Sequence, residues 1–187
     1  MKEFLLKTYQ SVKDIFSPLS LLKLLLIFIA YFFTAKGGLS LNAVSGFATL
    51  VWPPTGIAIV ALLVFGYRLW PSIFFAAFFI NLFTGAAAPV AVGIAVGNTL
   101  EAVVATLLLQ RFEFNLEMRT IKDALLFIFF GALCNTLVSA TIGVSSLWLG
   151  GVVILANYPA TWLAWWIGDM LGALIVGNLL LEYLHNK

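Results

Sequence analysis

The sequence predicts an all-α integral membrane protein, folded as a bundle of six transmembrane helices with both termini in the cytoplasm. The first observation is composition: 63% of the 187 residues are hydrophobic and only 10% are charged, whereas soluble domains carry about 25% charged residues. The second is a set of six apolar runs, most of them close to the ~20 residues that cross a bilayer core. The third is the distribution of basic residues, which predicts an orientation.

The chain divides into a short amphipathic juxtamembrane segment, residues 1–18, and a six-span membrane domain, residues 19–187. In the first segment four apolar side chains recur at helical spacing: Leu5, Tyr9, Val12 and Phe16. This pattern predicts a helix that lies on the membrane surface and ends at Pro18. The alternative is a frayed basic leader.

Apolar runs account for most of the membrane domain. They cover residues 19–35, 50–66, 69–84, 89–110, 123–148 and 159–182. Tyr67 and Arg68 make a short turn between the second run and the third. The one charged linker is 111–123, and residues 149–160 are expected to form a loop or a partly buried segment. We therefore expect no soluble domain.

Basic residues sort onto one side when the runs alternate across the membrane from a cytoplasmic N-terminus. The outer side then holds only Lys36. The inner side holds the other nine: Lys2, Lys7, Lys13, Lys23, Arg68, Arg111, Arg119, Lys122 and Lys187. This positive-inside bias supports an even number of spans and predicts a multi-pass protein of the plasma membrane.

Signatures of catalysis and of metal binding are absent from the sequence. There is no Gly-rich phosphate loop, no nucleophile elbow and no metal-spaced set of histidines and cysteines. The lone cysteine, Cys134, lies in an apolar run, and the lone histidine, His185, lies in the C-terminal tail. We therefore expect no enzyme, no cofactor, no metal site and no nucleic-acid partner.

Two of the eight acidic residues, Glu101 and Asp169, lie in the interior of predicted spans, whereas Asp123 and Glu182 stand at the ends of apolar runs. Each interior acid costs on the order of 2.5–3.5 kcal/mol at the bilayer centre, so each marks a functional or structural interior position. Counted from Pro89 and Pro159 at ~1.5 Å per residue, both lie roughly 15–18 Å below the outer face and can share one layer. No basic residue lies deep enough to pair with them. They are protonated, hydrogen-bonded to neighbours, or open to a cationic or polar ligand.

Small and polar residues form one face on each of three spans, and such faces let helices approach and hydrogen-bond. We expect the faces to converge on a polar core or ligand-binding site formed by Asp169, Glu101, Asn98, Asn135, Ser139, Trp165 and Trp166. In this hypothesis Asp169 accepts hydrogen bonds from a ligand or from indole N–H groups. Glu101 and Asn98 complete the pocket, and the two tryptophans stack on the ligand.

An outer entrance to this site is predicted from Trp52, Pro53, Pro54 and Trp162. A tryptophan before proline is extended, and two consecutive prolines exclude regular helical hydrogen bonds. The stretch either begins a helix at the outer interface or forms a broken entrance that lines a cavity. Trp162 also fits an aromatic belt at the membrane surface.

Four stretches together resemble the MASE1 domain, a bacterial membrane-associated sensor domain. They are 51-VWPPTGIAIVALLVFGYRLWPSIF-74, 97-GNTLEA-102, 139-SATIGVSSL-147 and 162-WLAWWIGDMLGAL-174, and they extend over most of residues 45–181. The resemblance implies a sensory input module of the bacterial inner membrane. Domains of this family are usually longer, so the chain is expected to be a short version that lacks later spans and the output domain. Asn178 also stands where the family often has a proline.

The leading functional hypothesis is a sensory module that binds an unidentified ligand or senses the state of the membrane. The resemblance implies a cytoplasmic output partner, either a histidine kinase or a cyclic-di-GMP enzyme. Besides the lipid bilayer, a second copy of the chain is a further candidate partner. The main alternative is the substrate-binding membrane component of a vitamin-type transporter, which the chain resembles only in size and span count. A third is a purely structural membrane anchor whose buried acids hold helices together.

Overall fold

Helices form all the regular structure of the described part of the chain, apart from an isolated antiparallel bridge between Val44 and Ala48. The structure is a computed structural model, and it describes residues 17–40 and 44–185. The surface helix predicted for residues 2–16 lies outside these residues. The helical fold class predicted from composition is therefore confirmed for the part described.

Proline sets the start of most of the helices, because its fixed φ and missing N–H suit the first turn. The residues at the first or second position are Pro18, Pro53 and Pro54, Pro71, Pro89 and Pro159. The helices that they begin are α2 (Pro18–Leu39), α3 (Pro53–Phe65), α4 (Trp70–Phe83), α5 (Ala88–Arg111) and α8 (Tyr158–Gly172). Short 3₁₀ turns, η1 (Tyr67–Leu69) and η3 (Leu155–Asn157), precede α4 and α8.

Two long helical stretches contain a π-helical turn. In the first, α6 (Ile121–Ile128) runs into the π turn η2 (Phe129–Leu133) and then into α7 (Thr136–Leu149). In the second, α8 runs into the π turn η4 (Ala173–Gly177) and then into α9 (Asn178–His185). Single π turns within α-helices are frequent at functional sites.

The six predicted apolar runs all appear as helices, but not all have the length of a membrane span. Four stretches are long and apolar enough to cross a membrane: Pro18–Leu39, Ala88–Arg111, Ile121–Leu149 and Leu155–His185. The other two, Pro53–Phe65 and Tyr67–Phe83, are shorter apolar helices. The structure thus supports a multi-pass helical membrane protein with four long helices and a short pair.

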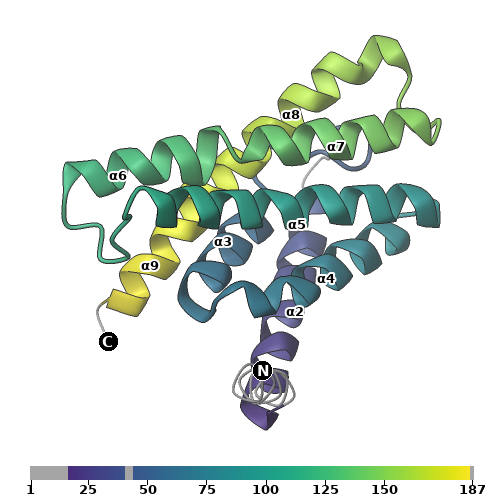
Figure 1. Ribbon diagram of the computed structural model, residues 1–187. Helices are drawn as coiled ribbons and strands as arrows, with labels where there is room; N and C mark the ends of the chain where they lie inside the picture. Colours follow the sequence, from purple (N-terminus) through teal and green to yellow (C-terminus); the bar gives the residue numbers. More distant parts are fainter. Residues whose placement is uncertain (1–16, 41–43, 186–187) are drawn as a thin grey trace, which may run out of the picture.

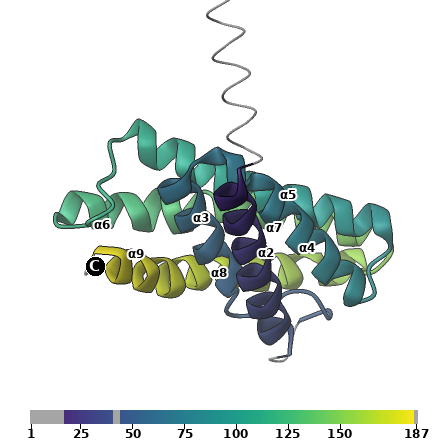
Figure 2. The same ribbon diagram turned by 90° about the horizontal axis from the view of Figure 1, so that it is seen from below.

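The helix arrangement is not a simple parallel bundle. Helices α5 and α7 lie side by side, and α4 packs against the opposite side of α5 (Figure 1). Helix α2 packs on α3 and α4 and runs across the direction of α5 in both views (Figures 1 and 2). Large exposed apolar side chains on several helices, among them Leu26, Phe33, Phe83 and Leu107, give the molecule an apolar exterior that suits lipid.

The loops group at two ends of the molecule. At one end the α5–α6 linker lies near the end of α9 (Figure 1). The η1 turn joins this end, because the Tyr67 hydroxyl donates to Gln110 Oε1 at 2.9 Å. Toward the other end the loop that follows α2 meets α8 through the hydroxyls of Ser45 and Thr161, 3.0 Å apart.

Candidate functional site

A non-helical stretch, residues Thr49–Trp52, here called the extended segment, packs against the C-terminal part of α8. The Trp52 N–H donates to the carbonyl of Gly168 at 2.8 Å. A Cβ added at Gly168 would overlap the Thr49 carbonyl, and one added at Gly172 would overlap the Trp52 carbonyl. These two glycines, one turn apart, flank Asp169. Their missing side chains therefore let a second backbone pass directly beside the acid.

This contact places the start of α3 inside the molecule. Gly168 lies ten residues after the start of α8, which corresponds to a depth of about 15 Å along the helix. Trp52 and Pro54 are buried at this contact. Of the two interpretations that the sequence left open, the structure has the helix start with prolines in the first turn. The prolines begin a helix whose first turn lies in the protein interior, where irregular backbone is tolerated.

Glu101 on α5 and Asp169 on α8 form a buried acid pair, each with a 1% exposed side chain. Both carboxyl groups lie near the same two hydroxyls, those of Ser139 on α7 and Thr55 on α3. Four helices thus meet at this point. Within residues 17–40 and 44–185 neither acid forms an ion pair. The sequence prediction that the two acids share one layer agrees with this geometry.

Several polar atoms around the acid pair have no hydrogen-bond partner. Glu101 Oε1 and Asp169 Oδ2 are buried and unpartnered, and so is the Thr55 hydroxyl, which is near the carboxyl groups but outside hydrogen-bond geometry. A buried polar atom left without a partner costs about 1–3 kcal/mol. Such a cluster calls for a ligand, a water or a rearrangement that supplies the missing contacts.

A chain of hydrogen bonds runs next to the acids through four helices. Trp165 Nε1 donates to Ser139 Oγ at 3.0 Å, and Ser139 Oγ donates to Asn98 Oδ1 at 2.8 Å. Asn98 Nδ2 in turn donates to the Tyr31 hydroxyl at 2.9 Å. The chain links α8, α7, α5 and α2. It fixes the orientation of Ser139, the hydroxyl that both acids share.

The tryptophans predicted for the site separate onto two faces of α8. Trp165 is buried against Gly143 of α7, where an added Cβ would come within 2.8 Å of its ring. Trp166 instead donates to the Leu133 carbonyl at 3.1 Å and stacks on Trp162, with ring centroids 6.1 Å apart. The structure therefore brings Trp165 to the polar layer but not Trp166 or Trp162.

The remaining predicted residue, Asn135, is fully buried at the start of α7, and neither atom of its side-chain amide has a hydrogen-bond partner. Sequence reasoning missed two residues, Tyr31 and Thr55. For Tyr31 a signal exists, because a tyrosine within an apolar run needs a partner for its hydroxyl. Thr55 follows the proline pair directly, so its hydroxyl is in the first turn of a helix that starts in the interior.

A very small cavity touches Asp169, one member of the acid pair. Its volume is about 10 Å³, which is about enough for one water molecule. Asp169 lines it on one side, and the other walls are Phe47, Ala48, Thr49, Trp52 and Trp165. The site is therefore closed to an organic ligand in this arrangement of the helices.

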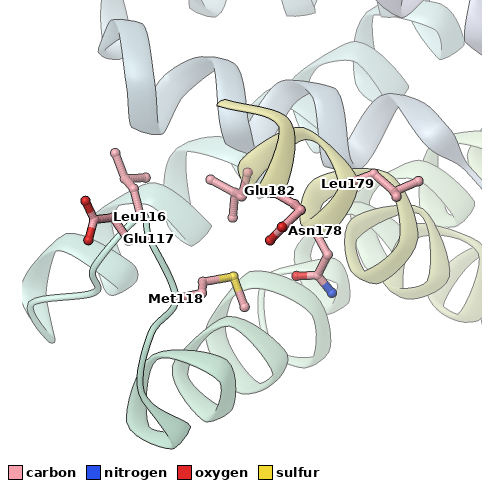
Figure 3. A pocket seen from close by; sticks show the side chains of 7 residues that line it. Leu116, Glu117, Met118, Asn178, Leu179 and Glu182 are labelled. Carbon is pink, nitrogen blue, oxygen red and sulfur yellow. The ribbon is translucent and has the colours of Figure 1, made fainter. Parts of the chain in front are cut away.

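A larger cavity, of about 390 Å³, lies between the α5–α6 linker and α9. Figure 3 shows Asn178 and Glu182 on α9 and Met118 on the linker around it. This cavity is separate from the acid pair. A third, of about 500 Å³, lies between α2 and α4 and is lined mainly by apolar side chains beside Lys36.

An apolar helical chain with a closed polar layer in its interior defines a multi-pass membrane protein with an internal site. Residues 20–186 match the family model of MASE1, so the chain belongs to this family of membrane-associated sensor domains. No curated protein and no solved structure matches the chain at a significant level. The resemblance drawn from the four sequence stretches is thereby confirmed.

The four stretches that carry the family resemblance surround the acid pair. The first supplies the extended segment and Thr55, the second Asn98 and Glu101, the third Ser139, and the fourth Trp165 and Asp169. The glycines of the fourth stretch allow the extended segment to approach. The four stretches therefore supply the residues that surround one site.

Proposed function

We propose that the chain is a sensory input module of the bacterial inner membrane that binds a small ligand at the acid pair. The ligand biases a cytoplasmic output partner, a histidine kinase or a cyclic-di-GMP enzyme. One observation carries the proposal: Asp169 lies on α8, and α8 continues through η4 and α9 as one helical stretch. A displacement at the acid therefore reaches α9 without crossing a loop.

Signalling of this kind requires two helix arrangements with different affinities for the ligand. The unpartnered oxygens of Glu101 and Asp169 supply a reason for such a difference, because an arrangement that completes their contacts gains free energy. The π turn η4 supplies a flexible point between Asp169 and α9, since its wider turn can shift along the helix. Binding at the acids is thus proposed to change the position of α9.

The proposed topology has six spans with both termini in the cytoplasm. Helix α3 contains 13 residues and spans about 20 Å. The extended segment before it supplies the rest of the crossing, since Trp52 contacts the C-terminal part of α8. The nine-to-one distribution of basic residues supports the orientation.

A vitamin-type transporter component is less well supported. Two cavities, of about 390 and 500 Å³, have the volume of about 300–1,000 Å³ that is usual for organic ligands, but neither is lined by Glu101 or Asp169. A purely structural anchor explains the burial of the acids but gives no reason for their unpartnered oxygens. A second copy of the chain remains a candidate partner in the sensing role.

Reporter output tests the sensory function directly. A diguanylate cyclase reporter fused after Lys187 converts movement of α9 into cyclic-di-GMP. Asp169→Asn keeps the side-chain volume and is expected to change reporter output at least threefold at equal membrane abundance. Glu113→Gln, in the linker after α5, is the matched control and should leave output unchanged. Equal output from all three proteins would reject the sensory role of Asp169.

A further inference from the structure

We infer that the acid pair holds a single hard metal cation, such as Na⁺, Mg²⁺ or Ca²⁺, bound by oxygen atoms of Glu101, Asp169, Thr55 and Ser139. This inference rests on the proposed function, because it names the chemical class of the ligand at the same site. It goes beyond the family assignment, which specifies no ligand.

The first observation is the missing countercharge. Both acids are 1% exposed and lie near the same two hydroxyls. No ion pair to either acid occurs among residues 17–40 and 44–185. Two buried acids are either protonated or placed beside a positive charge, because transfer of an isolated carboxylate from water is very costly. A cation placed between the two carboxyl groups supplies that charge.

The second and independent observation is the Thr55 hydroxyl. Its side chain is 3% exposed, and its oxygen has no hydrogen-bond partner. Buried threonines within the other helices bond to a carbonyl one turn earlier, as Thr106 does to the Ala102 carbonyl at 2.8 Å. Thr55 cannot do so, because it lies in the first turn of α3, directly after the proline pair. Its oxygen is therefore available to a ligand shared with the acids.

The donor atoms fit a hard cation. Carboxylate and hydroxyl oxygens suit Na⁺, Mg²⁺ and Ca²⁺, whereas softer metals prefer thiolate and imidazole. The described residues contain no cluster of three or more His, Cys, Asp or Glu side chains suited to a metal, so the site depends on hydroxyls to complete its coordination. A divalent ion balances both carboxylates. A monovalent ion balances one and leaves the other acid protonated.

The cavity beside Asp169 fits an occupant of this size. Its volume of about 10 Å³ accommodates one water-sized particle. The walls include Phe47 and Ala48 from the loop that follows α2, so the cavity lies between that loop and the acid pair. This space admits an ion but not an organic ligand, and of the four proposed ligand residues only Asp169 lines it.

Thermal unfolding of the purified protein in detergent tests the inference. The probes are NaCl, MgCl₂ and CaCl₂, each compared with choline chloride at the same ionic strength. At least one of the three is expected to raise Tm in a saturable way, whereas choline chloride is not. The Trp52 and Trp165 side chains line the cavity, so tryptophan fluorescence should report the same saturation.

Variants locate the ion. Thr55→Val preserves shape, removes only the hydroxyl and should weaken the apparent affinity at least tenfold, whereas Thr55→Ser should retain it. Thr106→Val removes a buried threonine hydroxyl of α5 and is the matched control with wild-type affinity. Glu101→Gln combined with Asp169→Asn should abolish the response; where that protein does not fold, the comparison of Thr55→Val with Thr55→Ser decides.

Three results would overturn the proposal that a cation binds at the acid pair. They are a response no larger than that to choline, equal affinity in Thr55→Val and Thr106→Val, and stabilisation by acid with no response to any salt. The reporter separates this failure from that of the sensory function. If Asp169→Asn alters reporter output but no cation raises Tm, the cation proposal is wrong and the sensory proposal stands. If a cation raises Tm but Asp169→Asn leaves reporter output unaltered, the cation proposal stands and the sensory proposal is wrong.

Discussion

The close approach of the backbone beside Asp169 depends on glycine residues, which have no side chain. A methyl group at Gly172 would overlap the carbonyl of Trp52, so Gly172→Ala must displace the extended segment and the first turn of α3. Overpacking of this kind costs about 1–3 kcal/mol. We expect a lower Tm in detergent for Gly172→Ala. Gly37→Ala in α2, where no atom lies within 4 Å of the added Cβ, should show no loss.

Tyr31 provides a second test at the level of a single atom. Tyr31→Phe removes the acceptor of the Asn98 side-chain amide, which is buried in the hydrogen-bond chain. An unpaired buried donor costs about 1–3 kcal/mol. The loss of stability should exceed that of Tyr67→Phe, whose hydroxyl bonds at an exposed position. Equal losses from the two variants would contradict the role of the buried chain.

The structure brings together the predicted residues whose helical spacing placed them on faces of small side chains. Glu101, Asn98 and Ser139 lie on faces whose small residues allow approach, and these residues do meet around Asp169. Trp166 could not share the site with Trp165, because adjacent helical residues point in different directions. It pairs instead with Trp162, four residues earlier. Thr55 was missed because nothing local shows that its helix starts in the interior.

Among the elements, the π turn η4 has a property that can be tested by deletion. A π turn holds one more residue per turn than an α-helix needs. Deletion of Ile175, a 47% exposed residue within η4, should therefore close the turn to regular α-helix and preserve the packing of α9. Deletion of Val104 in the regular helix α5 should rotate the following residues by about 100° and prevent folding.

Membrane abundance and thermal unfolding of the two deletion variants provide the measurement. Equal loss in both would show that η4 behaves as ordinary helix. The sequence could not predict either π turn, since neither contains a proline, and their glycines also occur in regular helices such as α5. Helix starts were more predictable, because proline at the first turn has a direct steric cause.

For the whole molecule, the proposed topology places Lys36 and Arg119 on opposite sides of the membrane. In a Cys134→Ala background, Lys36→Cys should react with a membrane-impermeant maleimide in intact cells. Arg119→Cys, in the exposed linker, should react only after the membrane is opened. Labelling of both positions from the same side would contradict the six-span arrangement.

The sequence predicted the apolar segments and their grouping well, but not their lengths or directions. Hydropathy reports where a chain is apolar and carries no information on helix direction. Helix α2 therefore appeared as one of six equivalent spans, although it runs across α5 (Figure 2). The short length of α3 also follows from packing, because the preceding backbone enters the interior between glycines of α8.

That extended segment has a consequence for the order of biosynthesis. Its backbone N–H at Trp52 is satisfied by a carbonyl of Gly168, a residue that the ribosome adds much later. Until α8 has been made, the Trp52 N–H lacks its hydrogen-bond partner. The second apolar run therefore cannot yet adopt its final position. The amino-terminal half therefore reaches its final packing only after α8 has been made. Completion of the last helix is then the event that closes the molecule.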